Sequence, residues 1–166
     1  MDREAQNVYL SKWYMEVNRY MDNAKDALKK AEKQDDGYYK DRKYVETACG
    51  VAYLAVLRAV DAWLFIKDVP EPGKKKHKSI DYYMFNVSEI DQKLASILNS
   101  AYNVLHLSGY YRGETRIKTI KEGFDAAYEI IEKIKPERLV EVKETKGQGL
   151  KRALNILLIA AAVMFK

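Results

Sequence analysis

Apolar side chains recur every three or four positions along much of the chain, which is the period of an α-helix with one buried face. The first such stripe begins near the N-terminus and ends at the polar sequence KQDDGYY. Its members are Ala5, Tyr9, Trp13, Val17, Tyr20, Ala24, Ala27 and Ala31. The pattern predicts one long amphipathic helix.

The second predicted helix runs from about Asp41 to Lys67. Its later part, VAYLAVLRAVDAWLFI, is apolar on nearly all faces, which predicts a place at the centre of a bundle. Pro70, Pro72 and Gly73 follow and end the helix, because proline lacks the amide hydrogen that a helix interior needs.

A short helix is predicted at SIDYYMFN, and a fourth helical segment follows it. Ser88 and Asp91 precede this segment with a spacing that resembles a capping box. Its apolar stripe consists of Ile90, Leu94, Ile97, Ala101 and Val104. We expect the segment to stop near Gly109, with this glycine as a left-handed cap.

The cleanest helical period lies in the fifth segment, which Pro136 closes. Its apolar positions are Ile117, Ile120, Phe124, Ala127, Ile131 and Ile134. The chain shows no alternating strand pattern of convincing length. We therefore predict an all-α fold: an up-and-down antiparallel bundle of about five main helices plus a short one, in a single domain over residues 1–166.

The C-terminal segment 150–165 is apolar from Ala153 to Phe165, apart from Asn155, and Lys151 and Arg152 precede it. Thirteen helical residues rise about 20 Å, whereas a hydrocarbon core is about 30 Å thick. We expect no transmembrane span here, but a helix in the core or at a dimer interface. A peripheral membrane anchor is the alternative.

Charge and composition narrow the function only slightly. The 166 residues carry a formal net charge of +5, which suits a phosphate-bearing partner without requiring one, and they include 13 tyrosines. The single cysteine, Cys49, forms no internal disulfide and leaves no thiolate cluster for zinc. The charged N-terminus lacks the apolar core of a signal peptide, so we expect a cytoplasmic protein.

The stretch NVLHLSGYYRGETR, residues 103–116, contains the strongest candidate site. His106 is two positions from Val104, which turns it away from the expected apolar stripe. Arg112 and Arg116 lie at the start of the next helix, where free amide groups favour an anion. Arginines there bind phosphate, and Tyr110 and Tyr111 can stack on bases. The alternative is a solvated helix face whose arginines pair with nearby carboxylates.

Arg58 and Asp61 are the only charged residues in the apolar part of the second helix. Because they are three positions apart and a buried charge is costly unless paired, we expect a structural ion pair. The functional alternative has Arg58 binding a ligand anion in a cleft of the bundle.

Other sites of recognised chemistry are missing from the sequence. The basic loop GKKKHK can bind polyanions loosely or simply remain solvated. His77 and His106 have no metal-binding spacing, and neither a glycine-rich phosphate loop nor a G-x-S-x-G motif occurs. We expect no cofactor, no metal and no catalytic residue.

Three stretches resemble the HEPN superfamily of small helical bundles, and more closely a group of uncharacterised bacterial proteins similar to it. They are YMDNAKDALKKAEK, YVETACGVAYLAVLRAVDAWL and AYNVLHLSGYYRGET. The resemblance implies a homodimer and, in many members, RNA cleavage or pairing with a nucleotidyltransferase partner.

Active members carry an arginine followed four to six residues later by a histidine. Here Arg58, Arg112 and Arg152 have other residues at those positions, and no arginine stands at them before His77 or His106. The sequence therefore predicts a HEPN-like module without catalytic activity, which binds a nucleotide, RNA or a protein partner.

Two alternatives remain at the level of sequence. The first is an atypical, metal-independent ribonuclease, in which His106 is the general acid or base and Arg112 stabilises phosphate charge. The second is a structural or membrane-peripheral protein that acts through its apolar C-terminal segment.

Overall fold

The computed structural model describes residues 3–73 and 78–136, and every element within them is helical. The elements are α1 (Arg3–Lys30), α2 (Arg42–Ile66), α3 (Ile80–Ser88), α4 (Gln92–Ala101), the π-helix η1 (Tyr102–Tyr111) and α5 (Ile117–Glu132). Extended pairing in the described ranges is limited to two isolated bridges, Lys33 with Tyr39 and Tyr38 with Arg116. The predicted all-α helical bundle is confirmed.

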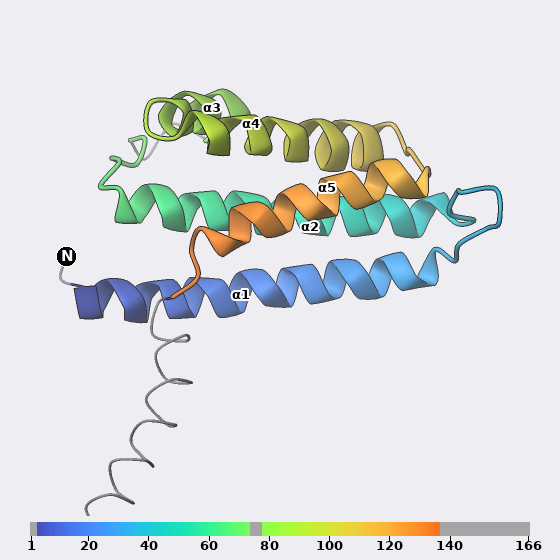
Figure 1. Cartoon of the computed structure of the whole chain (residues 1–166), viewed down its shortest axis with the longest axis horizontal. Coiled ribbons are helices and arrows are strands. Elements are labelled where there is room, and N and C mark those ends of the chain that lie inside the picture. Colours follow the sequence, from blue (N-terminus) through green and yellow to red (C-terminus); the bar gives the residue numbers. More distant parts are fainter. Residues whose placement is uncertain (1–2, 74–77, 137–166) are drawn as a thin grey trace, which may run out of the picture.

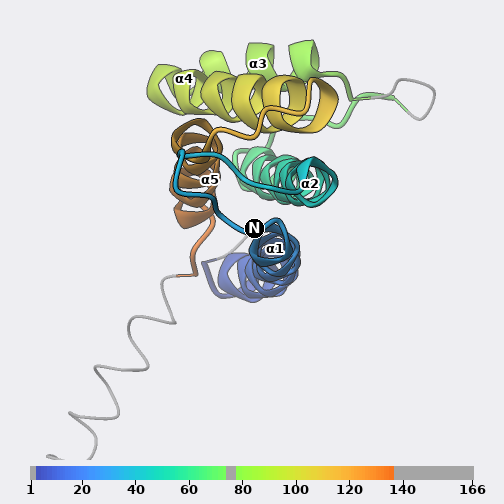
Figure 2. The ribbon, with the colours of Figure 1, turned by 90° about the vertical axis from the view of Figure 1, so that its right-hand side faces the viewer.

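The helices form three layers, with α1 on one side, α2 and α5 in the middle, and α3 with α4 on the other side (Figures 1 and 2). α2 packs against α1, η1 and α5. Its buried residues include Ala48, Ala52, Ala55 and Ala59, whose small side chains allow close approach of the neighbouring helices. In Figure 2 the side of α2 opposite α5 is not covered by any helix of the described chain.

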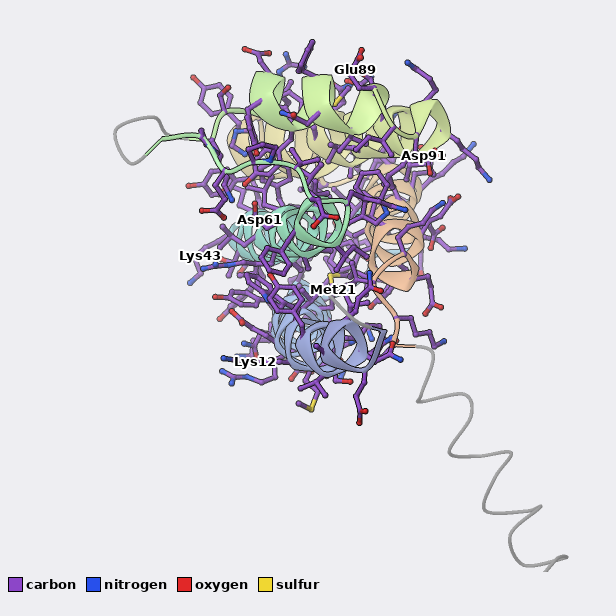
Figure 3. The ribbon with its side chains drawn as sticks, turned by 90° about the vertical axis from the view of Figure 1, so that its left-hand side faces the viewer. Lys12, Met21, Lys43, Asp61, Glu89 and Asp91 are labelled. Carbon is purple, nitrogen blue, oxygen red and sulfur yellow. The ribbon has the colours of Figure 1, made fainter. Side chains whose placement is uncertain are left out.

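Capping residues explain where three helices begin. The side chains of Asp41, Ser79 and Asp91 accept hydrogen bonds from the first turns of α2, α3 and α4. Asp91 therefore caps α4 itself, whereas Ser88, which has the spacing of a capping residue, is the last residue of α3. Asp91 (labelled in Figure 3) also accepts a hydrogen bond from Lys133 Nζ, at 3.3 Å, and this bond connects α4 to the residue that follows α5.

Two predicted apolar stripes are displaced. On α1, Met21 is fully buried and points toward α2 (Figure 3), although the predicted stripe passes through its neighbour Tyr20, which is only half-buried. On α4 and η1 the buried positions include Leu94, Leu98, Ala101 and Leu105, whereas Ile97 and Val104 are half-buried and Ile90 is exposed. The predicted stripes differ from the buried faces because large apolar residues such as Tyr20, Ile97 and Val104 lie at the edges of those faces, where they are only half-buried.

The prediction that Gly109 ends its helix with a left-handed cap is wrong. Gly109 is a buried residue inside η1, and the helix continues to Tyr111. A side chain at Gly109 would collide with Cys49 of α2, so glycine is required there for close packing. The left-handed glycine is Gly113, with a φ of +69°, in the turn before α5.

Two predicted features lie outside the described residues: most of the basic loop, at 74–77, and the C-terminal segment 150–165. Among the described helices, α2 is long and apolar enough to cross a membrane by length and composition alone. More than half of its most apolar window is buried inside the bundle, as is also common for a central bundle helix.

Candidate functional site: an aromatic groove between α2 and η1

The open side of α2 and the adjoining face of η1 form an apolar groove of about 580 Å³. We call it the aromatic groove; it is lined by Thr47, Gly50, Val51, Tyr53, Leu54, Leu57, His106 and Tyr110. Leu54 is 49% exposed and Tyr110 is 51% exposed, so large apolar side chains face solvent on both walls. None of the described residues that line the groove carries a carboxylate.

His106 lies at the centre of a stack of tyrosine rings. Its ring centroid is 4.8 Å from that of Tyr53, 5.4 Å from that of Tyr102 and 5.9 Å from that of Tyr110. Burial raises the pKa of Tyr53 to about 12, so this ring stays neutral at physiological pH. The stack forms a rigid wall of the groove in which His106 is half-buried.

Two adjacent small residues allow η1 to approach α2 this closely. A Cβ on Gly50 would lie 3.0 Å from the ring of Tyr110, and the Cβ of Cys49 lies 2.9 Å from the Cβ position of Gly109. The sequence therefore places small residues where the two helices meet and aromatic residues immediately beside them. This arrangement fixes the position of Tyr110 over α2.

The prediction that His106 turns away from the core is only partly right. It assumed that Val104 faces the core, but the buried residue is Leu105, which is next to His106 in sequence. The backbone of η1 also follows a π-helix, so positions predicted from an α-helix are rotated. As a result His106 lies against Tyr53 of α2 rather than on a fully solvated face.

The two arginines of the predicted phosphate site are both exposed, and they differ in their contacts. Arg112 is exposed at the end of η1, next to Tyr111, which is 77% exposed. The guanidinium of Arg116 instead lies over the ring of Tyr38, at 5.8 Å, and its backbone N–H donates to Glu114. A hydrogen bond with Tyr38, together with the charge of Glu114, raises the pKa of Arg116. Arg116 thus contacts the loop before α2.

The predicted ion pair between Arg58 and Asp61 does not form. Asp61 accepts hydrogen bonds from Lys78 Nζ, at 2.8 Å, and from the hydroxyl of Tyr83, at 3.0 Å. Arg58 is exposed, with its guanidinium 6.0 Å from the ring centroid of Trp13 on α1. The two side chains diverge because Asp61 faces α3 and Arg58 faces α1.

The contacts of Asp61 fix the segment that follows α2. Burial lowers the pKa of Lys78, but hydrogen bonds to Asp61 and Glu71 outweigh this effect and raise it. Burial and the charge of Asp61 raise the pKa of Tyr83, which keeps its hydroxyl protonated as a donor. Asp61 therefore acts here as a structural residue.

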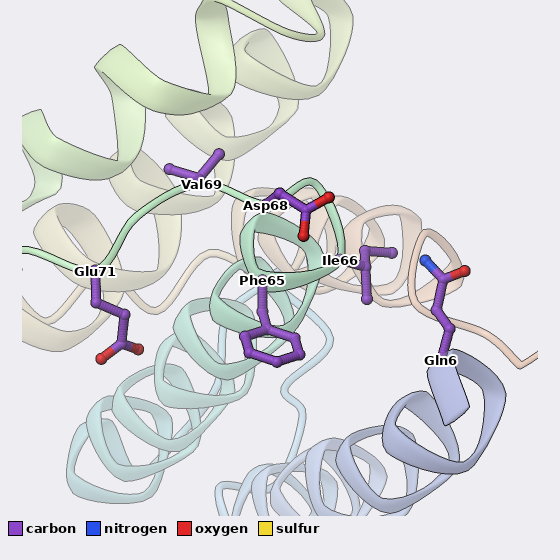
Figure 4. A pocket seen from close by; sticks show the side chains of 6 residues that line it. All are labelled: Gln6, Phe65, Ile66, Asp68, Val69 and Glu71. Carbon is purple, nitrogen blue, oxygen red and sulfur yellow. The ribbon is translucent and has the colours of Figure 1, made fainter. Parts of the chain in front are cut away.

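A second groove, of about 290 Å³, lies at the end of α2 (Figure 4). We call it the end groove; it is lined by Gln6, Phe65, Ile66, Asp68, Val69 and Glu71. Phe65 is 46% exposed and its ring stacks on Tyr9 of α1, with 4.3 Å between the centroids. Leu54 and Phe65 are therefore two exposed apolar side chains on the open side of α2, with the exposed Arg58 between them.

Sequence reasoning missed most residues of the aromatic groove. A helix that is apolar on nearly all faces predicts a central place in the bundle, and nothing in that pattern indicates that Leu54 and Leu57 line an open side. Among the described residues no group of three His, Cys, Asp or Glu side chains is placed to hold a metal ion.

Comparisons with known proteins agree with this architecture. A family model described as a domain of unknown function (DUF5618) matches residues 12–136. The chain belongs to this family. The match spans nearly all of the described bundle, so the helices that form the aromatic groove lie within the DUF5618 domain.

A solved structure of a protein of unknown function from Dyadobacter fermentans is similar to this DUF5618 protein, with a TM-score of 0.65 and 33% sequence identity. The match covers 78% of this chain and 98% of that chain. The comparison with curated proteins gives no match. Neither similarity bears on the HEPN resemblance, which stays a prediction.

Proposed function

We propose that this protein is a non-catalytic binding module that holds an apolar helix of a protein partner in the aromatic groove. The observation that carries the proposal is the exposed apolar side of α2, with Leu54 at its centre and Tyr110 on the facing wall. Contiguous exposed apolar surface of this kind is typical of protein-interaction sites, which are rich in tyrosine and poor in acidic residues.

The shape of the groove supports a helical partner. Its floor is a straight helix, and Val51, Leu54 and Leu57 recur along it at helical spacing. A partner helix with apolar residues at the same spacing packs against such a row as it does in a bundle. The tyrosine stack around His106 supplies a rigid wall, which lowers the entropic cost of binding.

The position of His106 supports a binding function. The faces of its imidazole pack against tyrosine rings that form one wall of the groove, so the side chain contributes to the shape of that wall. The ribonuclease alternative stays a prediction, tested by cleavage of labelled RNA by wild type and His106→Ala.

Site-specific photo-crosslinking tests the proposed function. A photoreactive amino acid replaces Leu54 in the full chain expressed in its native cells, and Phe85 is the control because it is apolar and 65% exposed on α3. We expect Leu54 to capture a protein segment with an apolar helical stripe. A synthetic peptide of that segment should bind the pure chain at least tenfold more weakly after Leu54→Glu. Equal capture at both positions would contradict the proposal.

A second candidate function is nucleotide or RNA binding at the end of η1. It is favoured by the exposure of Tyr111 beside Arg112, since stacking and phosphate contact need both groups accessible. Labelled single-stranded RNA should then bind with an affinity that falls with salt and with Arg112→Ala. Arg19→Ala, an exposed arginine on α1, is the matched control. Equal effects of the two substitutions would exclude a specific site.

A homodimer is the simplest form of the proposed module, with a second copy as the partner. Light scattering of the pure protein measures this directly. A dimer that dissociates in Leu54→Glu and persists in Phe85→Glu would place its interface at the aromatic groove.

A further inference from the structure

We propose that the apolar C-terminal segment of this chain, residues 153–165, occupies the aromatic groove of the same molecule and runs antiparallel to α2. The inference rests on the proposed function, because it names an occupant for the same groove. In this arrangement the chain fills its own aromatic groove, and a partner helix binds there only when it displaces the C-terminal segment.

The lengths of the groove and the segment agree. From Thr47 to Leu57 the floor of the aromatic groove rises about 15 Å, and the exposed Phe65 lies about 12 Å further along α2, beyond the exposed Arg58. A helix of thirteen residues rises about 20 Å. The segment therefore covers the exposed apolar residues of α2 without extending beyond that helix.

The segment also has the apolar face that the groove requires. Its single polar residue is Asn155, and Leu157, Ala160, Ala161 and Met164 lie on the opposite helical face. Small residues near the middle of that face allow close approach to Leu54, which stands out from α2.

The connection is long enough to reach the groove. The described chain ends at Pro136, toward the end of the bundle where α2 also ends (Figure 1). Sixteen residues separate Pro136 from Ala153, and sixteen extended residues span up to about 55 Å. Passing around one helix about 10–12 Å wide needs less than half of that length.

Charge favours the antiparallel direction. Lys151 and Arg152 immediately precede the apolar segment, and an antiparallel orientation places them at the C-terminal end of α2. Asp68 and Glu71 line the end groove there, both exposed, and Glu71 already accepts a hydrogen bond from Lys78 (Figure 4). The parallel orientation would bring the two cations to the positive end of the α2 dipole, where Asp41 already caps the helix and Glu46 pairs with Arg42.

The segment lies outside the part of the chain that is shared with the family model. That model ends at residue 136, and the Dyadobacter fermentans structure is matched over 98% of its length by 78% of this chain. The bundle described above is thus the shared unit. We infer that the apolar segment is an addition that covers its open side.

Disulfide trapping in the full-length chain tests the proposal. Leu54→Cys is combined with one tail cysteine at a time, at Leu157, Ala160 or Ala161, after Cys49→Ala removes the native thiol. We expect at least one pair to form an intrachain disulfide at least tenfold faster than the matched pair that uses Phe85→Cys. Peptide mapping by mass spectrometry identifies the bond.

Two other outcomes would overturn the proposal. Equal rates for Leu54 and Phe85 would show that the segment does not occupy the groove. Disulfides formed only between chains would show that the occupant comes from a second copy. Neither outcome contradicts the proposed function, because that function is tested separately, by photo-crosslinking of a partner protein at Leu54.

Proteolysis gives an independent readout in the same full-length chain. We expect chymotrypsin to cleave after Leu157 and Leu158 at least tenfold faster in Leu54→Glu than in wild type, whereas Phe85→Glu leaves the rate unchanged. Both substitutions are at exposed positions, and circular dichroism confirms that each variant is folded. Equal cleavage rates in all three proteins would contradict docking in the groove.

Discussion

Both sides of α2 carry apolar residues, but they differ in where the small side chains lie. The packed side places small residues where the neighbouring helices approach, among them Ala48, Ala52, Ala55 and Ala59. The open side carries Leu54, Leu57 and Phe65 beside the exposed Arg58, and Leu54 and Phe65 are about half exposed. Small residues let α1, α5 and η1 approach closely, whereas large ones on an open face leave apolar area for another helix. Side-chain size therefore distinguishes the two sides where hydrophobicity does not.

The largest expected effect on stability comes from comparing a leucine that packs against α2 with a leucine on the open side of α2. Leu105 of η1 is fully buried, and Leu105→Ala should cost about 2–5 kcal/mol because it leaves a cavity. Leu54 is 49% exposed in the described bundle, so Leu54→Ala should cost less than Leu105→Ala, and we expect a loss above about 1 kcal/mol because the docked C-terminal segment also contacts Leu54. Urea denaturation measures both values. A loss below about 1 kcal/mol at Leu54 would mean that nothing covers this residue in solution.

A smaller loss of stability is expected from a substitution where the packed side of α2 contacts η1. Gly109→Ala should destabilise the protein by about 1–3 kcal/mol, because the new methyl group meets the side chain of Cys49. Cys49→Ala removes the sulfur and should restore part of that loss. The double-mutant cycle should give a coupling of about 1 kcal/mol between the two positions. A coupling near zero would show that the strain lies elsewhere, for example at the carbonyl of Val104.

These packing details mark the limit of what the sequence predicts. Helix bounds were predicted well where local chemistry sets them: Asp41 caps α2, and α2 ends at Ile66, before the prolines. Gly109 was misassigned because a glycine at a helix end and a glycine at a helix crossing look alike in sequence. The ion pair of Asp61 was missed because its true partner, Lys78, is seventeen residues away and arrives through a loop.

The candidate site was predicted only in part for the same reason. His106 and Tyr110 stand out by residue type, and the structure brings both into one groove. The other wall is formed by Leu54 and Leu57, and nothing in a uniformly apolar helix indicates which side stays open. That information depends on where the other helices pack.

A polar contact between the start of α4 and the end of α5 has an expected effect on stability of about 1 kcal/mol. Asp91 caps α4, and its pKa is lowered first by the hydrogen bond from the Leu94 amide and then by Lys133. A lowered folded-state pKa stabilises the protein above the ordinary aspartate pKa of about 3.9, and this contribution is lost as pH falls through the folded value. Asp91→Ala should therefore cost about 1 kcal/mol at pH 6 and less at pH 3.

Denaturation at the two pH values checks this prediction, and Asp91→Asn provides the control. Asparagine caps helices about as well as aspartate, so this variant loses only the charge interaction with Lys133. A cost of Asp91→Ala that is independent of pH would show that the carboxylate charge contributes nothing.

The smallest effect on stability is expected from moving a thiol from the packed side of α2 to the open side. Burial raises the pKa of Cys49 to about 12, so its thiolate is scarce at pH 8 and its sulfur is enclosed. Thr47→Cys, on the exposed side and combined with Cys49→Ala, should unfold within about 0.5 kcal/mol of Cys49→Ala alone. A thiol reagent should label Cys49 only on unfolding and the new cysteine at once, because a helix of about 20 Å that begins beside Phe65 ends before it reaches Thr47. Slow labelling of both would contradict the exposure of Thr47 and the position proposed for the C-terminal segment.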